Sequence, residues 1–275
     1  MNDFVSVILP VYNGDRYLKY AIESVLKQTY TAFELIIVND NSSDNTQNII
    51  DSFSRHDNRI ICLRNFQQQG VAKSLNTGIN CSKGSVIARI DADDLWEKRK
   101  LKIQMERFEQ DPDLMLIGTR KILIDAKGDE MPQNHEFKCF SNKQIRKNIH
   151  VANLFNHSSV VYRKSVIKKF GHYNENYKNS EDYELWLRIC YRVKSEIIPI
   201  PLVRYRMHSS SVTSLKLKQQ MYYSIRARVA YIFNYGLRGF FTKLFLREVA
   251  FLILPYSIIT LIRSYRNKKN SYSNG

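Results

Sequence analysis

The sequence lacks most of the features that assign a chain quickly to a class. Its four cysteines stand far apart, without a C-x-x-C pair or a spacing typical of a metal site: Cys62, Cys81, Cys139 and Cys190. Nothing in this pattern favours disulfides, so we expect a reducing, cytoplasmic compartment. The first residues contain no basic segment followed by an apolar one, so no signal peptide is expected.

Neither a G-x-G-x-x-G fingerprint nor a P-loop is present, which argues against a dinucleotide site of the usual kind and against an NTPase. The uncharged stretch 249–262 has fourteen residues, fewer than the roughly twenty that a transmembrane helix needs. A hydrophobic fraction of 44% and 275 residues instead indicate a globular chain, either one large domain or a domain with an appendage.

Acidic residues are scarce at the C-terminal end. Residues 215–275 contain eleven Lys and Arg against Glu248 alone, so they carry +10 of the net charge of +16. Because this charge lies beside the apolar run 249–262, residues 240–269 are expected to contact an anionic membrane surface peripherally. The alternative is a helical subdomain that packs on the rest of the chain. A nucleic-acid-binding face would instead interleave basic and aromatic residues, so no nucleic-acid partner is expected.

Strand and helix patterns alternate through the first 110 residues. Buried strands are predicted at Val5–Val11, Phe33–Val38, Arg59–Leu63 and Val86–Ile90. Helices are predicted at Tyr17–Gln28, Asn45–Arg55 and Gly70–Asn80, the second with a capping box formed by Asp44 and Gln47. This alternation predicts an α/β fold with a mostly parallel central sheet and helices on both faces.

The pattern changes after residue 110. Strands are expected at Leu114–Ile124, Ser159–Tyr162 and Ile197–Arg206, and an amphipathic helix at Tyr183–Val193. Residues 133–158 are polar and irregular, and residues 216–266 are helical in character.

Three carboxylates follow the predicted strand that ends near Ile90: Asp91, Asp93 and Asp94. On an extended backbone Asp91 and Asp93 point to the same side, and such a pair suits a hard divalent cation such as Mn²⁺ or Mg²⁺. The alternative is that Asp93 or Asp94 caps the following helix.

Polar clusters follow all four predicted strands, at Pro10–Gly14, Asn39–Asp44, Asn65–Gly70 and Asp91–Asp94. Parallel strands share one carboxyl edge, where open α/β sheets bind their ligands. Each cluster alone could be an ordinary turn, but together they predict a polar crevice large enough for a nucleotide.

Three of these stretches resemble the family 2 glycosyltransferases of the GT-A fold: Ser6–Gly14, Glu34–Asp44 and Ala88–Asp94. Residues 4 to about 210 follow the family's order of motifs. The resemblance implies an inverting transfer from a nucleoside-diphosphate sugar, with UDP as the expected carrier, to a glycan or lipid-linked acceptor in polysaccharide biosynthesis. It also implies a catalytic domain at 1–214, with a donor half (1–110) and an acceptor half (111–214), followed by a basic helical extension (215–275).

The resemblance further implies roles for individual residues. Asp40 would contact the base, and Asp91 and Asp93 would hold a metal that bridges the diphosphate. Asn39 is a departure, because the family often has Asp there. Donor-binding residues would be Pro10, Tyr12, Asn13, Asp40, Arg89, Asp91 and Ala92.

A candidate general base lies in Glu181–Arg188, which resembles the family's second signature, in which the Asp is the base. Helical spacing places Asp182 on the apolar stripe of the predicted helix, with Glu181 and Glu184 on wetter sides. The alternative is that these acids only complement the helix dipole after an N-cap at Ser180.

Two histidines are further candidates. His208 resembles a family element that meets the diphosphate or the metal, and His157 is a candidate on the acceptor side. The sequence therefore predicts a metal-dependent glycosyltransferase with Asp182 as base. A sugar nucleotidyltransferase is the first rival, but it would need a Gly-rich basic loop where Tyr12–Asp15 stands. The second is a basic nucleic-acid- or membrane-binding module.

Overall fold

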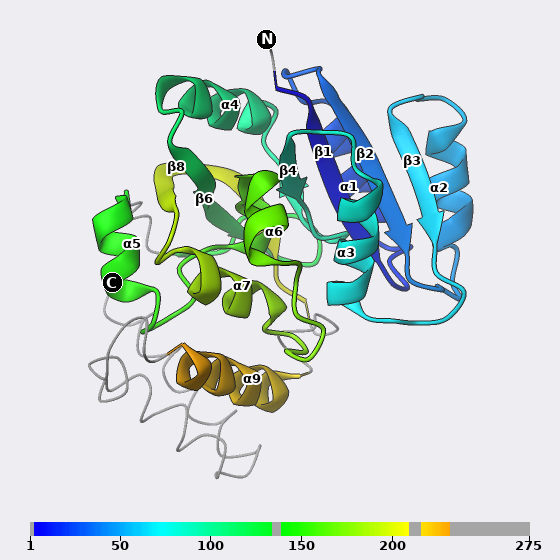
Figure 1. The fold of residues 1–275 in the computed structure, drawn as a ribbon. Coiled ribbons are helices and arrows are strands. Elements are labelled where there is room, and N and C mark those ends of the chain that lie inside the picture. The colour runs from blue at the N-terminus through cyan, green and yellow to red at the C-terminus, as the bar shows by residue number, and fades with distance from the viewer. Residues whose placement is uncertain (1–2, 134–138, 209–215, 232–275) are drawn as a thin grey trace.

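The computed structural model describes residues 3–133, 139–208 and 216–231, and these residues build one eight-stranded sheet (Figure 1). The strand order is β3-β2-β1-β4-β7-β6-β8-β5. The first four strands run parallel, as predicted: β1 (Val5–Val11), β2 (Phe33–Asn39), β3 (Ile60–Arg64) and β4 (Val86–Arg89). Their carboxyl ends therefore share one edge.

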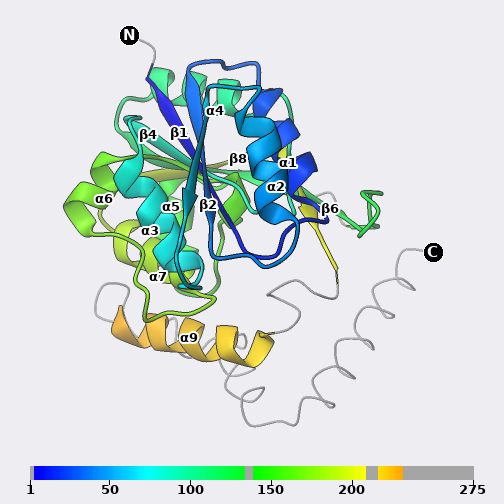
Figure 2. The same cartoon turned by 90° about the vertical axis from the view of Figure 1, so that its right-hand side faces the viewer.

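Both faces of the sheet are covered by helices, which confirms the predicted fold class. Alternate residues of β1 enter two different hydrophobic cores, with Val7 on one face and Ile8 on the other, so the strand is apolar throughout. One core includes α1 (Leu18–Leu26), α2 (Thr46–Ser54) and α4 (Lys100–Gln110). The other includes α3 (Val71–Cys81), α6 (Ser165–Phe170) and α7 (Glu181–Ile189), on the opposite side in Figure 2.

The later strands extend the same sheet rather than start a second one. They are β5 (Leu95–Trp96), β6 (Leu114–Ile124), β7 (Val161–Arg163) and β8 (Lys194–Arg206). Strand β7 lies antiparallel between β4 and β6, and β8 pairs parallel with β6 through several register shifts. Residues 133–158, predicted to be irregular, contain α5 (Asn142–Asn148), which starts at a capping box formed by Ser141 and Gln144.

Helix α9 (Leu217–Ala230) packs against α7, below it in Figure 1. The Ser180 hydroxyl donates a hydrogen bond to the Gln220 carbonyl over 2.9 Å, and Arg228 Nε donates to the Tyr183 hydroxyl over 2.9 Å. The membrane contact predicted for residues 240–269 lies outside the described residues. Among those described, no helix combines the length and apolar character that crossing a bilayer requires.

Candidate active site

Loops at the carboxyl ends of β1, β2, β3 and β4 line a cleft of about 440 Å³. Predicted site residues found in its wall are Pro10, Tyr12, Asn13, Asp40, Asp91, Ala92, Asp93 and His208. Tyr205 from β8 and Lys216 before α9 complete the side away from β3. The predicted crevice therefore exists where the parallel strands end.

The loops after β1 and β2 are fastened to each other. Asn13 has a positive φ of 48°, which Asn tolerates better than most residues. Its backbone N–H donates to the Ser42 hydroxyl over 2.9 Å, and its side-chain oxygen accepts from the Ser43 N–H over 2.9 Å. These hydrogen bonds hold the loop after β1 against the loop after β2, and both loops line the cleft.

Asp40 is buried at the end of β2 and organises the loop before α3. Its carboxylate accepts hydrogen bonds from Asn65 Nδ2 (2.6 Å), the Gln69 N–H (2.9 Å) and the Gly70 N–H (2.8 Å). A carboxylate has about four acceptor positions, so one remains for a ligand in the cleft. The preceding Asn39 is also buried and bonds the Ser42 N–H and the Gln47 side chain.

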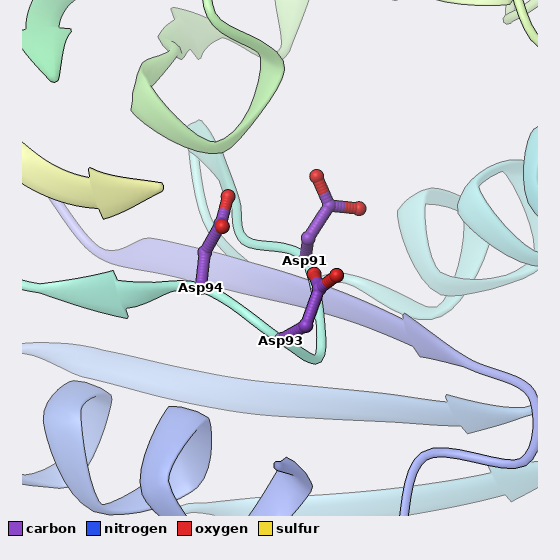
Figure 3. Close-up of side chains that lie close together, drawn as sticks. All are labelled: Asp91, Asp93 and Asp94. Carbon is purple, nitrogen blue, oxygen red and sulfur yellow. The ribbon is translucent and has the colours of Figure 1, made fainter. Parts of the chain in front are cut away.

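The side chains of Asp91, Asp93 and Asp94 extend from a single turn (Figure 3). One carboxyl oxygen from each lies within 4.8 Å of those of the other two. We expected Asp91 and Asp93 to point to the same side because side chains alternate along a strand. This reason is wrong, because β4 ends at Arg89, before these residues. The Asp94 N–H donates to the Asp91 carbonyl over 3.2 Å, so a turn gathers them.

The surroundings of Asp91 distinguish it from its neighbours. Both prongs of the Arg89 guanidinium bond its two carboxylate oxygens, and the Ser158 hydroxyl donates to one of them over 3.0 Å. Arg89 is only 3% exposed and, among the described residues, is not part of the cleft wall. Arg89 therefore lies behind Asp91, and its role in donor binding stays a prediction.

Asp93 pairs with His208 instead, with 2.8 Å between Asp93 Oδ2 and His208 Nε2. One carboxylate and one imidazole are oxygen and nitrogen ligands that suit Mn²⁺. The donor set therefore fits the predicted divalent cation. Asp91 is less suited because Arg89 already neutralises its charge.

Asp94 is fully buried, and the N–H of Arg206 donates to its Oδ1 over 2.9 Å. Burial raises the pKa of this carboxyl well above its usual range, and the charges of Asp91 and Asp93 add to the rise. Through its hydrogen bond from the Arg206 N–H, Asp94 fastens the turn to the end of β8. That fastening places His208 beside Asp93.

Asp182 lies in the first turn of α7, and Asn153 Nδ2 donates to its Oδ2 over 2.8 Å. Burial raises the pKa of Asp182, whereas the Asn153 hydrogen bond and the charge of Arg89 lower it. Asn179, three residues before Asp182, lies in the cleft wall, so α7 begins near the cleft, although Asp182 itself is not among the described residues of that wall.

The predicted faces of α7 are wrong. Glu181 and Glu184 are 5% and 1% exposed, whereas Asp182 is the more exposed acid. The helix packs between the sheet and α9, and Glu181 and Glu184 lie on its packed sides. Glu184 forms an ion pair with Arg188 at 2.9 Å instead.

His157 bonds the Tyr173 hydroxyl over 2.9 Å, and burial lowers the pKa of its imidazole well below the usual value. Its ring lies 6.0 Å from that of Trp186, which is fully buried in the core. Sequence reasoning missed Ser158, Asn153 and the burial of Glu181, because none of them carries a local pattern that marks a site.

The comparisons with known proteins agree with this geometry. The family model described as "Glycosyl transferase family 2" matches residues 6–171. A curated relative from Escherichia coli, UDP-Glc:alpha-D-GlcNAc-diphosphoundecaprenol beta-1,3-glucosyltransferase WfgD, is 32% identical over 254 residues, covering 87% of this chain and 95% of the relative.

Solved structures share the fold at low identity. Residues 1–349 of TarS from S. aureus in complex with UDP-GlcNAc give a TM-score of 0.69 at 18% identity, over 86% of this chain and 68% of that one. The mannosyltransferase PcManGT from Pyrobaculum calidifontis, in complex with GDP-Man and Mn²⁺, gives 0.64 at 17% identity, over 92% and 71%. With a family model covering more than half of its length, the chain belongs to the family 2 glycosyltransferases and has their GT-A fold.

Proposed function

We propose that this glycosyltransferase transfers a sugar from a nucleoside-diphosphate carrier, with UDP as the expected nucleotide, to a hydroxyl of a lipid-linked glycan, with inversion. Its relative WfgD is named for a UDP-glucose donor and a diphosphoundecaprenol-linked acceptor. The observation that carries the proposal is the placement of Asp182, a partly exposed carboxylate in the first turn of α7, three residues after Asn179 of the cleft wall.

The donor binds in the cleft. Asp40 uses its remaining acceptor position for the base, and Pro10, Tyr12 and Asn13 form the adjoining wall. Asp91 accepts hydrogen bonds from donor hydroxyls while Arg89 and Ser158 hold its carboxylate in one orientation. Because Arg89 is buried, it acts on the donor through Asp91.

Asp93 and His208 hold the divalent cation, Mn²⁺ or Mg²⁺. When bound, this cation supplies Lewis-acid stabilisation of the charge that develops on the departing diphosphate. Asp94 keeps the two ligands together through its hydrogen bond from the Arg206 N–H.

Asp182 accepts the proton of the attacking acceptor hydroxyl. The pKa of the Asp182 carboxyl is raised toward neutral pH, and a carboxylate with a higher pKa is a stronger general base. Asn153 orients the carboxylate by donating to Oδ2 and leaves Oδ1 for the hydroxyl. A single displacement with the base opposite the leaving group inverts the anomeric centre.

Replacing Asp182 with Asn tests the proposal. Asp182→Asn keeps the shape of the side chain but removes the base, so we expect nucleotide binding to persist while transfer falls by at least about a hundredfold. Binding is measured by calorimetry with UDP, and transfer by release of the nucleoside diphosphate. Asp113→Asn, at an exposed position far from the cleft wall, is the control. Near-normal turnover of Asp182→Asn would contradict the assignment.

A further inference from the structure

Lys121 on β6 is a cation whose charge the mechanism above does not use. Its ammonium nitrogen lies 3.6 Å from the centroid of the Tyr205 ring, and Tyr205 lines the donor cleft. The register pairs Lys121 with Val203 and Leu123 with Tyr205, so Lys121 and Tyr205 project from the same face of neighbouring strands. The ammonium group therefore rests on an aromatic side chain of the cleft wall.

Within the described parts of the chain, Lys121 makes no ion pair and no hydrogen bond through its side chain. Arg204, a cation on the neighbouring strand β8, does have acidic partners: it forms ion pairs with Glu97 at 2.8 Å and with Glu130 at 3.4 Å. Burial lowers the pKa of Lys121, while the charges of Asp94 and Asp91 raise it without either carboxylate reaching ion-pair distance. A partly buried ammonium group without an anion is costly, so a fold seldom keeps one without a partner.

The cation–π contact holds the ammonium in place but uses none of its three N–H donors for a hydrogen bond. An anion with several acceptor oxygens would satisfy these donors. Both substrates of the proposed reaction carry such oxygens: the diphosphate of the donor, and the diphosphate that joins a glycan to its lipid carrier.

We propose that Lys121 is a phosphate-binding residue at the edge of the cleft. Lys121 is not itself among the described residues of the cleft wall, but its ammonium group, seated on Tyr205 of that wall, contacts a phosphate oxygen of one of the two substrates when that substrate is bound. The inference rests on the proposed function, since it takes the phosphate from the substrates named there. Lys121 lies on β6, in the acceptor half of the chain, so the inference adds a residue of this half to those proposed to bind the charged parts of the substrates.

The experiment compares Lys121→Met, which keeps the length of the side chain without its charge, with Lys121→Arg, which keeps a charge. We expect Lys121→Met to raise KM for one substrate at least about tenfold with a smaller change in kcat, and Lys121→Arg to restore most of that loss. KM is measured separately for the nucleotide sugar and for a diphospho-lipid-linked acceptor. An increase for the first assigns the donor phosphate, and an increase for the second assigns the acceptor phosphate.

Two further variants make the result specific. Tyr205→Leu removes the aromatic platform, so it should raise the same KM by a smaller factor. Lys127→Met, at an exposed position on the turn after β6, should change neither KM. Thermal melting of each variant checks that it folds.

Unchanged KM values for both substrates in a folded Lys121→Met variant would overturn the inference, as would equal loss in Lys121→Arg. These outcomes differ from failure of the proposed function, because in that case the wild-type chain itself would transfer no sugar.

Discussion

At the scale of single residues, Glu181, beside the proposed base, is a buried carboxyl in an unusual environment. It is 5% exposed, and its Oε2 has no hydrogen-bond partner among the described residues. Burial, and then the charge of Asp182, raise the pKa of Glu181 from 4.5 to about 8. The folded chain therefore keeps this proton at neutral pH, whereas the unfolded chain loses it.

This difference predicts a pH dependence of stability. Below pH 4.5 Glu181 is protonated in both the folded and the unfolded chain, so its contribution to the free energy of unfolding is fully present. This contribution is lost progressively as the pH rises toward about 8, because the unfolded chain loses the proton first. Glu181→Gln stays neutral throughout, so the free energy of unfolding of the variant should rise relative to wild type between pH 5 and pH 8. Urea denaturation at several pH values measures it, with the exposed Glu175→Gln as control. A constant difference across this range would contradict the raised pKa.

Several site residues were predictable because one rule of topology gathers them. Asp40, Asp91 and Asp93 each follow a parallel strand, and the ends of parallel strands meet at one edge. The contacts that set their properties were not predictable. These contacts are the two hydrogen bonds from Arg89 to Asp91, the hydrogen bond from the Ser158 hydroxyl, and the burial of Glu181. They depend on how β7, the short helix His157–Ser159 (η1) and α7 pack together, and no local sequence pattern indicates that packing.

At the scale of elements, the parallel strands were predicted to within one or two residues because buried strands are continuous apolar runs. Caps were harder. Gln47 was expected to complete a capping box with Asp44, but its side chain bonds Asn39 and Asp51 instead. Asp44 instead accepts from the Thr46 N–H over 3.0 Å and from the Asp15 N–H over 3.0 Å, so a shorter local turn and a tertiary contact take the place of the expected motif.

Helix α3 lies close to β1 and β2 at Gly78. A Cβ at this position would come within 2.7 Å of Ile8 Cγ2 and 3.3 Å of Val38 Cγ2. Alanine improves helix propensity by up to about 1 kcal/mol, but overpacking a core costs about 1–3 kcal/mol. We therefore expect Gly78→Ala to lower the free energy of unfolding by roughly 1 kcal/mol, as measured by urea denaturation.

Lys73→Ala, at an exposed position on the same helix, is the control and should change stability by less than about 0.5 kcal/mol. A Gly78→Ala variant as stable as wild type would show that α3 can move away from the sheet at little cost.

At the scale of the whole molecule, one sheet joins the donor and acceptor halves that the sequence suggested. Trp96 belongs to the core on one face and Trp186 to the core on the other. Because every strand is hydrogen-bonded to its neighbours in a single sheet, we expect the described fold to unfold in one cooperative transition.

Trp96→Phe leaves Trp186 as the only tryptophan, and Trp186→Phe leaves Trp96, so each variant reports on one core. In each variant the denaturation midpoint from fluorescence should equal that from far-UV circular dichroism. Midpoints that separate within a variant would show that the two cores unfold independently.

The position of β7 between β4 and β6 also limits how the enzyme can enclose its substrates. A hinge between the donor and acceptor halves would have to break the hydrogen bonds that join β4 to β7. Closure by rotation of two lobes, common in enzymes with separate domains, therefore does not suit this architecture. We therefore expect water to be excluded at the rim of the cleft, by side chains and loops rather than by rotation of two lobes.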